Sequence, residues 1–175
     1  MSKPVGPGAW RAWIVSWFVH SVRTTVAAVL SLALARLLRL PEAYWAAITT
    51  LVVMQSTLGA AWTVSTRRFF GTAVGALVGG VVGGGIGGGL LGFGLGIFAL
   101  GLICGLLRLD ASAYRFAGIT FAIVALVGHT EPAAAIALHR FVEVTMGILA
   151  ALLVSAVWPA REPTGGGLRR PNERT

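Results

Sequence analysis

The chain has 175 residues, of which 56% are hydrophobic and 11% are charged, and its mean hydropathy is +0.81. This composition lies outside the range of soluble globular domains and indicates an integral membrane protein. In a soluble domain the net charge of +8 would suggest nucleic acid. Here the basic residues stand at the ends of apolar runs, as the positive-inside rule expects, so we expect membrane lipid and no nucleic acid as a partner.

Residues 1–21 are expected to form a cytoplasmic and interfacial segment. Within Ala9–Ser21, the indoles of Trp10, Trp13 and Trp17 are three and four residues apart and therefore share one helix face. Tryptophan favours the headgroup level of a bilayer. The pattern predicts an amphipathic helix that lies in the membrane interface.

Six membrane spans account for the apolar sequence and define one expected membrane domain over residues 22–160. Their expected limits are Val22–Leu40, Ala43–Ala60, Phe69–Gly85, Leu90–Leu107, Tyr114–Gly128 and Phe141–Trp158. Residues 161–175 are polar and rich in glycine, and are expected to be a disordered cytoplasmic tail. The expected fold is an all-α bundle of about six transmembrane helices preceded by the interfacial helix.

The first span has a second interpretation. Val26–Leu34 resembles the apolar region of a signal peptide, and Ala33–Ala35 resembles a cleavage site. The segment before it is long and carries three tryptophans, whereas the basic leader of a signal peptide is short. We therefore retain this segment as a membrane span.

The stretch from Phe69 to Leu107 has thirty-nine residues without a charged side chain. As one helix it would be roughly 58 Å long, about twice the thickness of a bilayer's hydrocarbon core, so it must form two spans. The glycine cluster Gly83–Gly89 is the expected turn. Before it, the four-residue spacing of Gly71, Gly75 and Gly79 predicts a ridge for close helix packing, within or between subunits.

The distribution of basic residues predicts the orientation. If the N-terminus is cytoplasmic, eleven Lys and Arg residues lie inside and three lie outside. The inside set is Lys3, Arg11, Arg23, Arg67, Arg68, Arg108, Arg115, Arg161, Arg169, Arg170 and Arg174, and the outside set is Arg36, Arg39 and Arg140. We therefore expect a multi-pass protein of the cell (inner) membrane with both termini cytoplasmic.

No pattern typical of an enzyme or a metal site is visible. The chain has no nucleophile motif and no phosphate-binding loop that ends in lysine, and His20, His129 and His139 lack the cysteine or carboxylate spacing of a metal site. We expect no catalytic activity, no cofactor and no metal.

Two polar positions inside the expected spans are candidates for function. Gln55 lies about twelve residues into the second span, where an unpaired amide would cost roughly 2 kcal/mol or more, so it either lines a path or holds two helices together. Arg140 and Glu143 share a helix face and can pair. Glu143 is the single carboxylate inside any expected span, which makes it a candidate for proton coupling as well as for a structural ion pair.

Arginines at the expected cytoplasmic ends of the first and third spans are candidates for an anion-binding vestibule. They are Arg23, Arg67 and Arg68. A guanidinium group binds carboxylates with two parallel hydrogen bonds. The alternative is that they only mark the topology.

Residues 20 to 160 resemble the fusaric acid resistance (FUSC) and aromatic acid exporter superfamily. The residues that carry the resemblance are Arg23 at the first span, Pro41, Tyr44, Trp45 and Ala46 at the second, Gln55 near its end, Arg68, Gly71, Thr72 and Gly75 at the third, and Arg140, Glu143, Gly147, Trp158 and Pro159 in the last. The resemblance implies a six-span membrane unit and efflux of aromatic or other organic acids. Plant malate channels have a similar six-helix unit, so the resemblance also implies anion conduction.

The expected function is therefore transport of small organic anions, by efflux or channel-like conduction, along a path lined by Arg23, Gln55, Arg68 and Arg140. Larger members of the family carry a cytosolic domain and often a second six-span unit, and neither is seen here. Because an even number of spans returns the chain to the cytoplasm, two copies can lie parallel, so we expect a homodimer. The alternative is a non-transporting scaffold or accessory subunit that needs a partner chain.

Overall fold

The computed structural model describes residues 7–55, 57–85, 89–126 and 132–159, and all regular structure in these ranges is helical. The helices are α1 (Pro7–Leu37), α2 (Tyr44–Val53), α3 (Leu58–Gly85), α4 (Leu90–Leu106), α5 (Ala111–Leu126) and α6 (Ala133–Val157). The expectation of an all-α membrane bundle with about six helices is confirmed. Two of the described helices, over Trp10–Leu37 and Ala133–Val157, are long and apolar enough to cross a membrane, and α2, α4 and α5 are shorter apolar helices.

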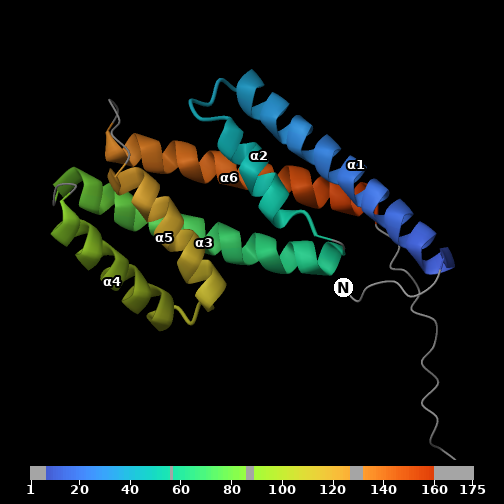
Figure 1. The fold of residues 1–175 in the computed structure, drawn as a ribbon. Coiled ribbons are helices and arrows are strands. Elements are labelled where there is room, and N and C mark those ends of the chain that lie inside the picture. The colour runs from blue at the N-terminus through green and yellow to red at the C-terminus, as the bar shows by residue number, and fades with distance from the viewer. Residues whose placement is uncertain (1–6, 56, 86–88, 127–131, 160–175) are drawn as a thin grey trace, which may run out of the picture.

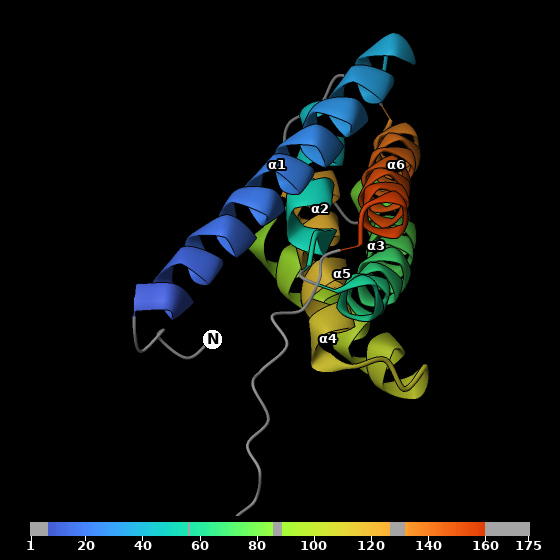
Figure 2. The ribbon, with the colours of Figure 1, turned by 90° about the vertical axis from the view of Figure 1, so that its right-hand side faces the viewer.

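Helices α3 and α6 run antiparallel to each other and are packed side by side (Figure 1). Helix α5 packs on α3, α2 packs on α6, and α4 lies on the outside against α5 and α3. Helix α1 packs on α2 and α6, and its N-terminal half extends away from the other helices (Figures 1 and 2). Helix α1 begins and α6 ends at the same end of the bundle.

The glycine ridge of α3 lies against α5 of the same chain. A Cβ atom at Gly71 or Gly75 would overlap the carbonyl oxygen of Ala113 or Ala117, and one at Gly79 would lie 2.9 Å from Cβ of Val124. The two backbones are therefore in direct contact along the ridge. This packing surface is used within the subunit.

Helix α1 is continuous where a boundary was expected. The separate interfacial helix over Ala9–Ser21 and the span from Val22 form one helix of 31 residues, from Pro7 to Leu37. The stacked indoles of Trp10 and Trp13, 5.0 Å apart, do lie on one face of it. No helix-breaking residue separates the two segments, so nothing ends the helix between them.

The helices at the second and third expected spans have other limits than those spans. Helix α2 has ten residues and ends at Val53, because Met54 is extended, with φ −64° and ψ 109°. Helix α3 begins at Leu58, ten residues before Arg68, and not at Phe69. Its first turn is capped by the Thr57 hydroxyl, which accepts a hydrogen bond from the backbone N–H of Ala60 at 3.3 Å.

The start of the last helix was also misplaced. Helix α6 begins at Ala133, directly after Pro132, and not at Phe141. Charged residues are expected at the ends of apolar helices, but Arg68 and Arg140 are both buried within helices. Each has partners inside the bundle, so neither needs a helix end.

The expected turn over Gly83–Gly89 lies only partly within the described residues. Gly83–Gly85 form the end of helix α3, and helix α4 begins at Leu90. Residues 86–88 of the predicted turn, and the predicted tail over residues 161–175, lie outside the described residues.

Candidate functional site

The short helix α2 packs closely on α6. Ten residues are about 15 Å of helix, roughly half of the hydrocarbon thickness. Helix α2 lies directly on α6: a Cβ atom at Gly147 would overlap the carbonyl oxygen of Ala46. The Thr50 hydroxyl lies 3.0 Å from the carbonyl oxygen of Gly147 and 2.9 Å from that of Ala46. Helix α2 is therefore held closely against α6.

An ion-pair cluster joins the start of α2 to α6. The guanidinium of Arg140, which is 2% exposed, pairs with the carboxylate of Glu42, and its Nη1 lies 3.6 Å from Oε2 of Glu143. It also lies 4.2 Å from the ring centroid of Trp45. The backbone N–H of Glu42 donates to Oε1 of Glu143 at 3.0 Å. Two carboxylates thus face one guanidinium, although Nε and Nη1 of Arg140 and Oε2 of Glu143 make no hydrogen bond with the described residues.

A second buried arginine, Arg68 of α3, has only neutral partners. Its Nε and Nη2 donate to the hydroxyl of Thr49 in α2 at 3.2 and 3.0 Å. Its guanidinium lies 4.9 Å from the ring centroid of Phe116. Among the described residues no carboxylate forms an ion pair with Arg68. Within the described part of the chain, no ion pair therefore compensates the charge of Arg68, although the side chain is buried.

The neighbouring Arg67 behaves differently. Its guanidinium is exposed and pairs with the carboxylate of Asp110, whose Oδ1 also caps the first turn of α5 by accepting from the N–H of Ala113 at 2.9 Å. This pair joins α3 to the connection between α4 and α5. Arg67 thus has a local partner at the surface, whereas Arg68 faces the interior.

The third buried arginine, Arg23, has no partner within the described residues. It is 0% exposed, and its Nε, Nη1 and Nη2 make no hydrogen bond there. One turn further along α1, Ala27 belongs to the same apolar cluster as Val53 and Met54 at the end of α2. Arg23 therefore lies near the end of α2, while Arg140 lies near its start.

Gln55 does not occupy the interior of a helix as expected. It lies in the break between α2 and α3, and its Nε2 donates to the carbonyl oxygen of Val52 at 3.2 Å. The side chain is half-buried and satisfies one of the last carbonyl groups of α2. Gln55 lies outside a helix because α2 ends at Val53, before the expected end of the second span.

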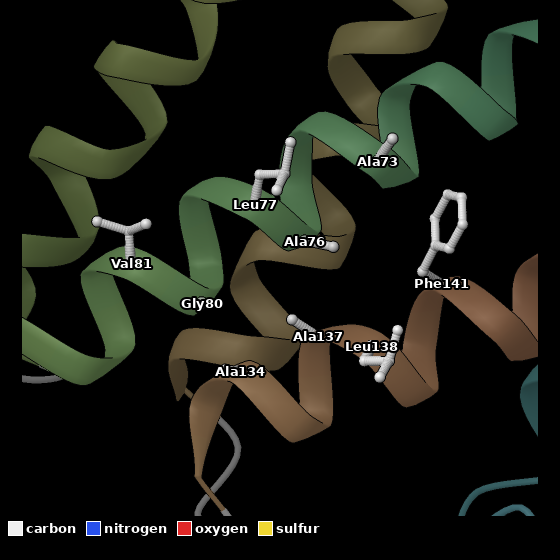
Figure 3. A pocket seen from close by; sticks show the side chains of 9 residues that line it. All are labelled: Ala73, Ala76, Leu77, Gly80, Val81, Ala134, Ala137, Leu138 and Phe141. Atoms are coloured by element: carbon white, nitrogen blue, oxygen red, sulfur yellow. The ribbon is translucent and has the colours of Figure 1, made fainter.

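The structure also contains an apolar groove between α3 and α6 (Figure 3). Its volume is about 530 Å³. It is lined by Ala73, Ala76, Leu77, Gly80, Val81, Ala134, Ala137, Leu138 and Phe141. No polar side chain lines it, so it offers no group that could bind an anion.

Sequence reasoning missed Glu42, Thr49 and Trp45 as partners of the buried arginines. Two features of the sequence could have drawn attention to Glu42: it is one of six acidic residues in the chain, and it directly follows Pro41. Its partner Arg140 is 98 residues away, however, and such a pairing has no local sequence signal. The described residues include no group of three or more His, Cys, Asp or Glu side chains that could hold a metal ion.

Comparisons with known proteins agree with this membrane architecture. Residues 29–154 match the family model described as fusaric acid resistance protein-like. The chain is 29% identical over 163 residues to the inner membrane protein YeeA of Escherichia coli (strain K12), and the alignment covers 91% of this chain and 46% of that relative. The chain thus spans about half the length of this curated relative. No solved structure matches the chain. Because the family match covers most of its length, the chain belongs to the fusaric acid resistance protein-like family.

Proposed function

We propose that the chain transports small organic anions across the inner membrane, by efflux or channel-like conduction, along a path beside α2. The observation that carries the proposal is the pair of buried arginines, Arg23 and Arg68, that no carboxylate among the described residues neutralises. Taking an ion out of water costs several kcal/mol, and an unpaired charge leaves that cost uncompensated. A transported anion that stops beside these groups would offset it.

The short helix α2 supports the same proposal. In many transporters, discontinuous helices lie beside the substrate, because their ends expose backbone groups inside the protein. Here Thr49 of α2 holds Arg68, and the end of α2 lies near Arg23. Arg140 of α6, which lies beside the start of α2, and Gln55, which follows the end of α2, complete the set of path-lining residues that we propose.

We propose a homodimer as the transporting assembly. The start of α1 and the end of α6 lie at one end of the bundle, which suits a parallel pair of copies with both termini in the cytoplasm. The chain covers 46% of YeeA, so two copies would supply about the length of that relative. This coverage also favours a second candidate, an accessory subunit that needs a partner chain for transport.

Flux measurements with the purified chain in liposomes test the proposal. Uptake of benzoate and of a dicarboxylate such as malate is measured with and without a pH gradient. We expect Arg68→Gln to lower anion flux at least tenfold, while Arg67→Gln, the adjacent and exposed control, and Arg170→Gln leave it nearly unchanged. Equal losses in all three variants would point to general surface charge and contradict a path at Arg68.

The accessory-subunit candidate predicts a different result. The wild-type chain alone would then show no flux of either anion in liposomes, and flux would appear only after a partner chain is added. Saturable flux by the chain alone would exclude that candidate.

A further inference from the structure

Three neighbouring side chains of α1 carry buried polar atoms that the other described residues leave unsatisfied. These atoms are Nδ1 of His20, Nε, Nη1 and Nη2 of Arg23, and Oγ1 of Thr24. Residues separated by three and four positions are neighbours on one helix face. The three side chains therefore form a single patch, which we call the α1 polar patch.

The α1 polar patch lies between an aromatic stripe and the end of α2. On its N-terminal side, the ring of His20 makes an edge contact with Trp17 at 6.1 Å, and Trp17 contacts Trp13 at 5.9 Å. On its C-terminal side, Ala27 belongs to the apolar cluster that also contains Val53 of α2 and Val144 of α6. These neighbouring side chains are apolar or aromatic, so they do not neutralise Arg23.

The donors of the patch indicate the chemistry of the missing partner. A guanidinium has five N–H donors and no acceptor, so its partner must supply acceptor atoms. A hydroxyl can donate one further hydrogen bond, and an imidazole can donate through whichever nitrogen carries its proton. Two oxygens on one planar or tetrahedral centre, as in a carboxylate or a phosphate, match the guanidinium fork.

We infer that the α1 polar patch is an oxyanion-binding site, in which Arg23 binds a carboxylate or phosphate group and His20 and Thr24 each supply a further hydrogen bond. The inference rests on the proposed function in one respect: the oxyanion that we first expect at the site is the carboxylate of the transported anion. The phosphate of an anionic lipid is the second source of the same chemistry. Either would neutralise the one fully buried arginine that lacks a partner among the described residues.

Thermal unfolding of the full chain in uncharged detergent tests the site directly. Benzoate, inorganic phosphate and phosphatidylglycerol are added separately. A ligand that binds the folded state raises the melting temperature as its concentration rises above Kd. We expect this shift in the wild type and in Arg36→Gln, an exposed control on the same helix, and its loss in Arg23→Gln.

The unliganded variants separate a binding role from a structural one. If the role of Arg23 is to bind an anion, Arg23→Gln without anion should melt at the wild-type temperature or above, because an unpaired buried charge has been removed. If Arg23 only holds the fold, the same variant melts lower before any anion is added. Thr24→Val should keep a melting shift but need a several-fold higher anion concentration, since the guanidinium is still present.

The outcomes decide both the site and its source. A shift with benzoate or phosphate supports a soluble oxyanion, and a shift with phosphatidylglycerol alone supports a lipid phosphate. No shift with any of the three probes, or an equal shift in Arg23→Gln, would overturn the inference. Binding through Arg23 without flux in liposomes would refute the proposed function and leave the site intact, whereas flux with unchanged binding in Arg23→Gln would refute the site alone.

Discussion

The buried arginines of this bundle differ in what balances their charge. Arg140 faces two carboxylates and an indole ring, Arg68 has a hydroxyl and a phenyl ring, and Arg23 has no partner among the described residues. The same substitution should therefore have a different effect at each position. Stability and ligand response together can assign the roles of the three residues.

At Arg140 we expect a large loss of stability. Arg140→Gln would leave Glu42 and Glu143 facing each other without a cation, and breaking a buried pair from one side costs about 3–5 kcal/mol. Chemical unfolding in detergent measures the change. The exposed control Arg115→Gln should stay within about 0.5 kcal/mol of the wild type, and a similarly small change for Arg140→Gln would show that the cluster contributes little.

At Glu143 we expect an effect on proton coupling. Two carboxylates share one guanidinium, which leaves a negative charge that a proton can neutralise. Glu143→Gln keeps the shape of the side chain but cannot ionise, so the pH dependence of anion flux should disappear. Flux and melting temperature are measured on the same variant. A wild-type pH profile combined with a lower melting temperature would assign Glu143 a purely structural pairing with Arg140.

At the scale of the helices, the glycines of α3 set the distance to α5. A methyl group at Gly75 would overlap the backbone of Ala117, so Gly75→Ala must push the two helices apart. Overpacking of this kind costs about 1–3 kcal/mol. Gly59, near the start of the same helix, has open space within 4 Å of the point that a Cβ atom would occupy, so Gly59→Ala should be neutral or stabilise by about 0.5–1 kcal/mol.

Melting temperatures of the two glycine variants check this pair of expectations. The prediction is a difference in sign: a lower melting temperature for Gly75→Ala and an equal or higher one for Gly59→Ala. Wild-type stability for Gly75→Ala would mean that α3 and α5 do not touch along this ridge.

The sequence was sufficient to predict the helical class and the small-residue ridge, because periodicity and glycine spacing are local signals. It was not sufficient for the helix ends near Arg68 and Arg140. A charge in an apolar run is expected at a span end, but Arg68 has a hydrogen-bond partner in Thr49 of another helix, and Arg140 has an ion-pair partner in Glu42 of the loop before that helix. Contacts between residues far apart in sequence decide such cases, and they leave no periodic pattern.

At the scale of the whole molecule, the positions of the start of α1 and the end of α6 make a tandem fusion possible. Helix α1 begins and α6 ends at the same end of the bundle, so a flexible linker can join the end of one copy to the start of the next. If the transporting unit is a parallel homodimer, such a fusion should match the flux of two separate copies. An inactive fusion made from an active single chain would contradict the parallel arrangement.

The same fusion shows whether the path belongs to one subunit or to the interface between two. A tandem chain with Arg68→Gln in one half keeps one intact copy. If each copy conducts independently, flux falls to about one half of the unmodified tandem, because one path remains. We expect a larger loss, because the groove that the structure describes between α3 and α6 within one subunit is lined by apolar side chains. A value of one half would place a complete path inside each copy and would contradict a shared path at the interface.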